Sequence, residues 1–150
     1  MATIKLSDFN ITLSNAATTF SKEKIKEIQL PVLKLYEGLS KYRIFNEGKA
    51  SDSSLIGKYR SLSHRKARQA RGRQTGYKDL EFEGDLRRSL TVGTNGKDFV
   101  FGFATDAARL IGAAQEKQTK KDIWNPTTSE ENDINKATAK LITKCLKTVF

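Results

Sequence analysis

The residues that could do chemistry gather in two neighbouring stretches of the sequence. The first runs from Gly57 to Gly76, contains no Asp or Glu, and is otherwise mostly Ser, Gln, Gly and Ala. It supplies seven of the ten net positive charges of the chain: Lys58, Arg60, Arg65, Lys66, Arg68, Arg71 and Arg73. Because burying an unpaired charge is costly, we expect this basic loop to be solvated or to face an anion.

Neutralisation of phosphates is the chemistry that this loop suits best. Lys and Arg side chains bind nucleic-acid phosphates without reading the bases. Tyr59 and Tyr77 flank the loop but do not interleave with its cations, which disfavours a platform for stacking single-stranded bases. A solvated basic loop without a partner is the alternative interpretation.

Carboxylates follow the basic loop directly. Asp79, Glu81, Glu83 and Asp85 alternate, and they would share one face of an extended segment. Such a face could hold the divalent metal of a nuclease, but no His or Lys constellation accompanies it. We therefore favour an acidic edge that pairs with basic groups of its own chain or of a neighbour. In the second case Glu81, Glu83 and Asp85 would be contacts between subunits of a head-to-tail ring.

The remaining composition disfavours most enzymes. His64 and Cys145 are the single histidine and the single cysteine, too few for a His/Cys zinc site or an internal disulfide. The Gly93–Gly96 segment lacks the spacing and the Lys-Ser/Thr ending of a triphosphate-binding loop. No apolar run is long enough to cross a membrane. We therefore expect no catalytic residues, no metal, no cofactor and no membrane partner.

The patterning of the 150 residues predicts one domain whose elements position these stretches. Residues 1–17 could form an arm or a strand, and residues 20–45 an amphipathic helix with a kink or break at Pro31. The polar and basic loop at 46–76 could include a short helix. A further helix is predicted at 106–116, with Ala107, Leu110, Ile111 and Ala114 on its apolar face. The final helix, 129–148, would begin at a Thr128–Glu131 capping box.

Between these helices, residues 84–104 predict a short helical turn followed by a β-hairpin with an Asn95-Gly96 turn. Phe99, Phe101 and Phe103 alternate on the second strand and are candidates for the core. The predicted fold is α+β: a small antiparallel sheet with a central hairpin, packed against the long N-terminal helix and the C-terminal helix. Because a lone hairpin is marginal in water, residues 1–13 and 78–83, or neighbouring subunits, are expected to complete the sheet.

One local motif and the order of the elements carry a family resemblance. Gly84-Asp85-Leu86-Arg87-Arg88-Ser89-Leu90 matches a Gly-x-Leu-x-x-Ser-(Leu/Ile) element, and a hairpin follows it. Over residues 20–148 the chain resembles the tail-completion and head–tail joining proteins of tailed bacteriophages, of the Mu virion morphogenesis type. Ala114-Gln115-Glu116 stands where this family usually has a His-Gln step. Ile123–Pro126 stands where an Arg-Pro-Phe-like segment leads into the last helix.

The resemblance implies a structural virion protein without catalytic residues. Copies would form a six- or twelve-fold ring in the neck or tail, between the portal-side connector and the tail proteins, assembled in the host cytoplasm. Genomic DNA would pass through the lumen, and the basic loop would face this DNA non-specifically or face the neighbouring subunit. A free-standing, sequence-independent nucleic-acid-binding protein is the main alternative function, and a small nuclease is a third.

Overall fold

The computed structural model describes residues 21–81, 83–96 and 98–149. The described elements are α2 (Lys22–Lys41), the π-helix η1 (Tyr42–Asn46), α3 (Leu62–Ala70), α4 (Asp85–Ser89), β1 (Leu90–Asn95), β2 (Asp98–Phe103), α5 (Asp106–Thr119) and α6 (Thr128–Val149). This arrangement confirms the predicted α+β fold, in which an antiparallel hairpin packs against a long N-terminal and a C-terminal helix. The predicted segment 1–17 lies outside the described residues.

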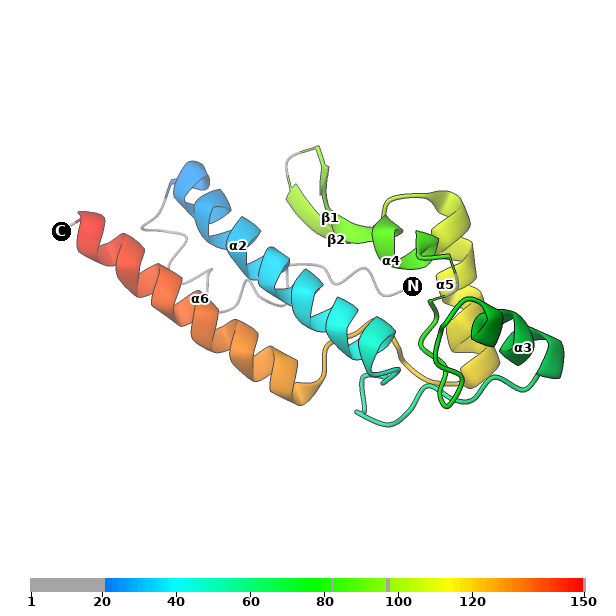
Figure 1. The fold of residues 1–150 in the computed structure, drawn as a ribbon. Helices are drawn as coiled ribbons and strands as arrows, with labels where there is room; N and C mark the ends of the chain where they lie inside the picture. The colour runs from blue at the N-terminus through cyan, green and yellow to red at the C-terminus, as the bar shows by residue number, and fades with distance from the viewer. Residues whose placement is uncertain (1–20, 82, 97, 150) are drawn as a thin grey trace.

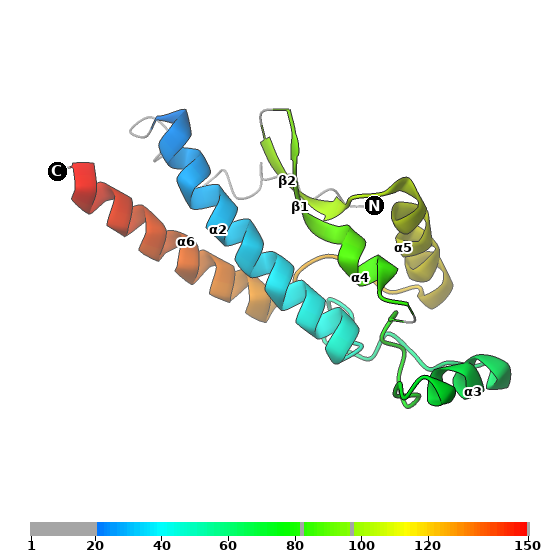
Figure 2. The same ribbon diagram turned by 45° about the horizontal axis from the view of Figure 1, so that its top comes forward.

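Helices α2 and α6 lie side by side and antiparallel (Figure 1). The hairpin packs on another side of α2, next to α4 and α5 (Figure 2). The core between these elements contains Ile28, Val32 and Tyr36 from α2 and Ile134 from α6, each at most 5% exposed. We refer to α2, η1, α4, β1, β2, α5 and α6 together as the helical body.

Helix α2 begins where Ser21 accepts a hydrogen bond from the Lys24 amide, which satisfies a free N–H of the first turn. The break predicted at Pro31 does not occur, because α2 continues through it as one helix. Pro31 is exposed, whereas its neighbours Val32 and Leu33 are buried in the core. Packing of these side chains therefore outweighs the loss of one backbone hydrogen bond.

The hairpin pairs Leu90 with Phe103 and Val92 with Phe101, so the apolar side chains of both strands share one face. Phe101 is buried and lies edge-on to Tyr36 of α2, with ring centroids 4.7 Å apart. Phe99 and Phe103 are partly buried and pack against the same core. The turn falls one residue later than predicted. Asn95 pairs with Asp98, and Gly96 adopts a positive φ of 63°.

Helix α5 buries a different face from the one predicted. Its buried residues are Ala108 and Gly112, whereas Leu110 and Ile111 are 69% and 51% exposed. Phe103 explains the choice, because a Cβ atom added at Gly112 would lie 2.5 Å from the Phe103 ring. Only the small-residue face of α5 can approach this ring. The bulky apolar face is therefore left open.

The final helix is capped one residue earlier than predicted. Thr127 and Glu130 form the capping box, in which each side chain accepts a hydrogen bond from the other's amide. The other Glu130 oxygen accepts from Nε of the buried Arg43 at 2.9 Å. Arg43 also donates to the carbonyls of Lys49, Ile123 and Asn125. One arginine thus joins η1, the loop before α6 and the start of α6.

Within the described residues the sheet has two strands, and Lys78–Glu81 adds none. Glu37 of α2 borders β1 instead: its carboxylate accepts from the Val92 amide at 3.2 Å and from the Thr91 hydroxyl at 3.3 Å. None of the helices in the described part of the chain has the length and apolarity to cross a membrane.

Candidate nucleic-acid interface

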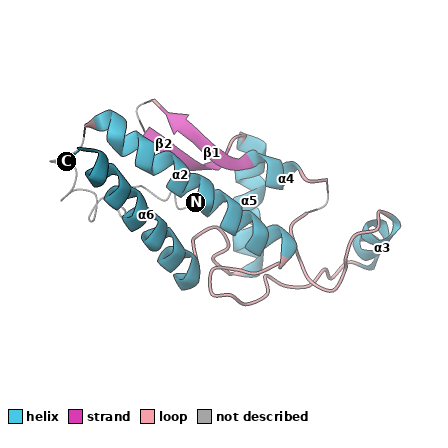
Figure 3. Cartoon of the chain, turned by 60° about the vertical axis from the view of Figure 1, so that its left-hand side comes forward, coloured by secondary structure: helices cyan, strands magenta, loops and turns pink. Residues whose placement is uncertain are grey.

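The basic loop forms a projection from the helical body, here called the α3 projection and comprising residues 57–78. Its base is closed by a hydrogen bond from the Lys78 amide to the Gly57 carbonyl, at 2.7 Å. Helix α3 stands well apart from α2 and α6 and is joined to the body by two loop segments (Figure 3). The cations are therefore presented away from the core.

Helix α3 has clear ends. Ser61 caps its start by accepting a hydrogen bond from the His64 amide, and Gly72 follows its end with a positive φ of 66°. A nine-residue helix is too short to be stable alone in water. The only buried residue of α3 is Arg68. Tertiary contacts of this arginine must therefore hold the helix in place.

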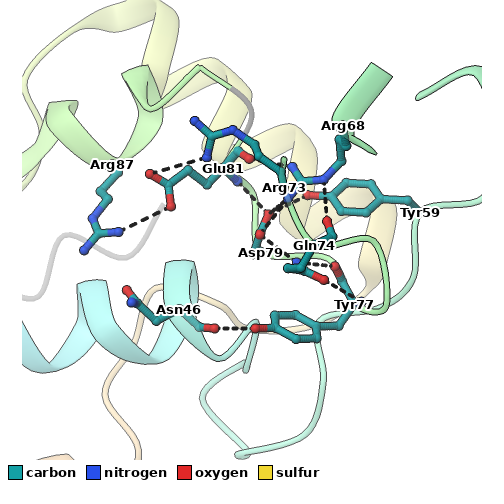
Figure 4. A network of polar contacts seen from close by, with 9 residues as sticks. All are labelled: Asn46, Tyr59, Arg68, Arg73, Gln74, Tyr77, Asp79, Glu81 and Arg87. Carbon is teal, nitrogen blue, oxygen red and sulfur yellow. Dashed lines mark hydrogen bonds and ion pairs between the residues drawn. The ribbon is translucent and has the colours of Figure 1, made fainter. Parts of the chain in front are cut away.

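Arg68 is fully buried and lies at the centre of a polar network (Figure 4). Its Nη2 donates to both oxygens of Asp79, at 2.9 and 2.7 Å. The other guanidinium nitrogens donate to the carbonyls of Gln74 and Glu81. The guanidinium carbon lies 4.4 Å from the centre of the Tyr59 ring, a cation–π contact. This burial removes Arg68 from the cations predicted to face DNA or a neighbouring subunit.

Asp79 is the matching anion, and its oxygens are fully used. Besides Arg68, it accepts from the Tyr59 hydroxyl at 2.8 Å, the Gln74 side-chain amide at 2.6 Å and the Glu81 backbone amide at 3.0 Å. Burial and the Asp79 carboxylate both raise the pKa of Tyr59, so this hydroxyl remains a donor. The network thus fastens α3 to the segment that returns to the body.

The other predicted carboxylates also have partners within the chain. Glu81 faces Arg73 at 3.9 Å and Arg87 at 3.3 Å, and Glu83 faces Arg71 at 3.4 Å. Asp85 pairs with Arg88. These contacts fit the interpretation of an acidic edge that pairs with its own chain. The role of Glu81, Glu83 and Asp85 between subunits remains a prediction.

The alternating carboxylates do not share one face. Leu80 adopts a positive φ of 54°, which interrupts the extended conformation that the alternation assumes. Asp79 consequently points to Arg68, while Glu83 and Asp85 are exposed. No group of three or more His, Cys, Asp or Glu residues in the described part of the chain could hold a metal ion.

Five of the predicted cations are exposed, and Arg71 among them faces Glu83. The other four are Lys58, Arg60, Arg65 and Lys66. None of these four forms an ion pair with a carboxylate of the residues that the structure describes. They divide into two pairs. Lys58 and Arg60 line a cavity at the base of the projection, whereas Arg65 and Lys66 do not. On α3, the buried Arg68 and the cavity-lining His64 mark the inward side. Lys66 lies opposite this side and Arg65 on its flank; both are exposed, and together they are here called the outward face.

Sequence reasoning missed Lys78, which lies just outside the acid-free stretch. Its Nζ donates to the Gln118 side chain at 2.7 Å, and it lines the same cavity as Lys58 and Arg60. Burial lowers the pKa of Lys78, and the positive charge of Arg60 lowers it further. No sequence pattern marked this residue, because only the fold brings it next to Arg60.

The motif that carries the family resemblance has a structural explanation at each named position. Gly84 precedes α4 with a φ of 82°, and a Cβ atom there would lie 2.8 Å from Nη1 of Arg88. Leu86 and Leu90 are buried in the core. Ser89 accepts a hydrogen bond from the Thr105 amide. The named positions of the motif therefore build the turn from α4 into the hairpin.

Comparison with protein-family models found no match, and comparisons with curated proteins and with solved structures found none that is significant.

Proposed function

We propose that this protein is a structural subunit of a tailed-bacteriophage virion, a ring-forming tail-completion or head–tail joining protein of the neck. In this role it connects the portal-side connector to the tail, and DNA passes along its α3 projection. The motif at Gly84–Leu90 and the order of the helices and hairpin support the proposal by their resemblance to that family.

The observation that carries the proposal is the outward pair Arg65 and Lys66 on α3. Both are exposed, have no carboxylate partner among the described residues, and sit on a helix that stands apart from the body. Cations on a projecting helix can neutralise phosphates of a duplex without contacting base edges. A genome that slides through a neck requires contacts of this sequence-independent kind.

Two further features favour an assembling subunit. Leu110 and Ile111 of α5 and Leu62 of α3 are each more than half exposed. The described sheet has two strands, and a lone hairpin of this size is marginal in water. Apolar side chains and an open sheet of this kind suit contacts with neighbouring copies.

The proposal is tested by the oligomeric state and by the content of virions. Purified protein should form closed rings, seen by analytical ultracentrifugation and negative-stain electron microscopy, and mass spectrometry should find the chain in purified particles. A monodisperse monomer that is absent from particles would contradict it.

A free-standing basic nucleic-acid-binding protein is the second candidate, favoured by the same outward cations. It predicts that the monomer binds duplex DNA strongly, with an affinity that falls steeply with salt. Monomeric protein with such binding, and no ring at any concentration, would favour this candidate over the neck subunit.

A further inference from the structure

A cavity of about 690 Å³ lies where the α3 projection meets α4 and α5. Its volume is in the range of sites that hold small ligands or short peptide segments. Lys58, Arg60 and Lys78 contribute to its lining from the projection, and Ile111 and Gln115 from α5.

The three cations of the cavity have no carboxylate partner among the residues that the structure describes. Lys58 and Arg60 pair with no carboxylate of the described chain, and the Lys78 ammonium donates only to the neutral amide of Gln118. Burial disfavours the charged form of Lys78, and the nearby Arg60 adds repulsion of like charge. Three positive charges therefore line one cavity, and the two carboxylates that also line it, Glu83 and Asp85, pair instead with Arg71 and Arg88. A bound anion would relieve the repulsion between the three cations.

The rest of the lining argues for an anion attached to an apolar group. Ile56, Leu80, Leu86 and Ile111 supply apolar surface, and Ile111 is half exposed because α5 turns its bulky face away from Phe103. The Ile111 side chain can therefore contact an apolar group of a ligand. Hydrophobic and ionic contacts can thus be made by one ligand.

Protein fits this lining better than nucleic acid. Glu83 and Asp85 also line the cavity, and a phosphate backbone with a charge on every nucleotide would meet them. The buried Oε1 of Gln115 accepts no hydrogen bond from the described residues. After rotation of its amide toward the cavity, a peptide N–H could donate to this oxygen, whereas a phosphodiester has no hydrogen to donate.

We propose that this cavity binds a protein segment from an assembly partner, in which a carboxylate stands beside a large apolar side chain. The carboxylate contacts Lys58, Arg60 and Lys78, and the apolar side chain packs on Ile111 and its neighbours. The proposal rests on the proposed function only in assigning the segment to an assembly partner. We assign the segment to a different protein and not to residues 79–85 of a neighbouring copy, because those carboxylates already have ion-pair partners within their own chain.

The test measures binding of labelled octapeptides to the full chain by fluorescence anisotropy. The first probe is an octapeptide in which Asp and Leu alternate. In the second Asn replaces Asp, which removes the charge, and in the third Ser replaces Leu, which removes the apolar side chain. The fourth probe is a 20-base-pair DNA duplex. The matched variants are K58Q/R60Q in the cavity and R65Q/K66Q on the outward face, each of which removes one Lys and one Arg. All four side chains are exposed, so both variants should fold.

The Asp-Leu peptide should bind, and both altered peptides should bind more weakly. K58Q/R60Q should weaken Asp-Leu binding about 10- to 100-fold, because two charge-assisted contacts are lost. Ile111→Ser should weaken it about 3- to 10-fold through lost apolar contact. R65Q/K66Q should leave it unchanged.

Three results would overturn the proposal: no binding of the Asp-Leu peptide to the wild type, an equal loss in both double variants, or K58Q/R60Q impairing only the duplex. The last would assign the cavity to nucleic acid. Because ring formation and virion content are measured separately, a failure here is distinguishable from a failure of the proposed neck role.

Discussion

The helical body and the α3 projection each contain one buried arginine, and the two arginines have different structural roles. Arg43 lies in η1 next to Ile44 and Phe45, which are at most 3% exposed and belong to the hydrophobic core. Arg68 is the only buried residue of its helix. In the body the arginine supplements a hydrophobic core, whereas in the projection it takes the place of one. The two regions should therefore respond differently to the same substitution.

The largest effect is expected for Arg43→Met. The change leaves the Glu130 carboxylate buried without its partner and frees three carbonyls. Loss of one member of a buried ion pair should lower the free energy of unfolding by about 3–5 kcal/mol. Urea denaturation followed by circular dichroism measures this. Arg109→Met, at an exposed pair with Asp106, is the control and should cost less than about 1 kcal/mol.

Arg68→Met should instead act locally. Asp79 would lose its cation, and α3 is too short to persist without an anchor. Amides of residues 62–70 should lose protection from hydrogen exchange while the body keeps its protection and its urea midpoint. Arg71→Met removes an exposed cation and should leave α3 protected. A fall in the urea midpoint as large as that of Arg43→Met would show that projection and body unfold as one unit.

The body should also contain an acid-sensitive contact between α2 and β1. Burial alone would raise the pKa of Glu37, but hydrogen bonds from Lys34, Lys41 and the Val92 amide outweigh it and lower the pKa to about 2. A lowered pKa means that the stabilisation is complete above the unfolded value of 4.5 and is lost as pH falls toward 2. It contributes at most about 3 kcal/mol at neutral pH.

Glu37→Gln tests this contact. The variant should be less stable than wild type at pH 7, and the difference should shrink steadily between pH 4.5 and pH 2. Urea titrations at several pH values measure it. A difference that stays constant across this pH range would contradict the assignment to Glu37.

A glycine in each region tests how closely each is packed. Gly112→Ala in the body would place a methyl group against the Phe103 ring and should cost about 1–3 kcal/mol. Gly76→Ala in the projection meets no atom within 4 Å and should change stability by less than about 0.5 kcal/mol. Similar losses at both positions would mean that the projection is packed as tightly as the body.

The sequence predicted the body better than the projection. Alternation predicted that Phe99, Phe101 and Phe103 share one face of the second strand and belong to the core, and Phe101 is buried while the other two pack against the same core. A period of two is a local property of strands, so the sequence contains it. The same reasoning chose the wrong face of α5. It favoured the bulky Leu110 and Ile111, whereas the space left by Phe103 admits only Ala108 and Gly112. Which face is buried depends on a partner side chain that local periodicity does not contain.

In the basic loop, too, the sequence did not show which side chains are buried, here for the charged residues. Its composition predicted that all seven cations are solvated or face an anion outside the loop, but Arg68 is buried against Asp79 of its own chain, eleven residues along the sequence. Nothing in the spacing separates Arg68 from Arg65 or Lys66. Neutralising all seven cations, the test that composition alone suggests, would therefore remove the anchor of α3 together with the exposed charges.

The central claim, that the outward face of α3 contacts DNA phosphates, is tested most directly by salt-dependent duplex binding of R65Q/K66Q. The control is K136Q/K140Q, which removes two exposed cations of α6. Loss of two phosphate contacts should make the slope of log K against log salt shallower by about 1.8 for R65Q/K66Q, while the control keeps the wild-type slope. Equal slopes for R65Q/K66Q and the wild type, or an equal change in both variants, would contradict the claim.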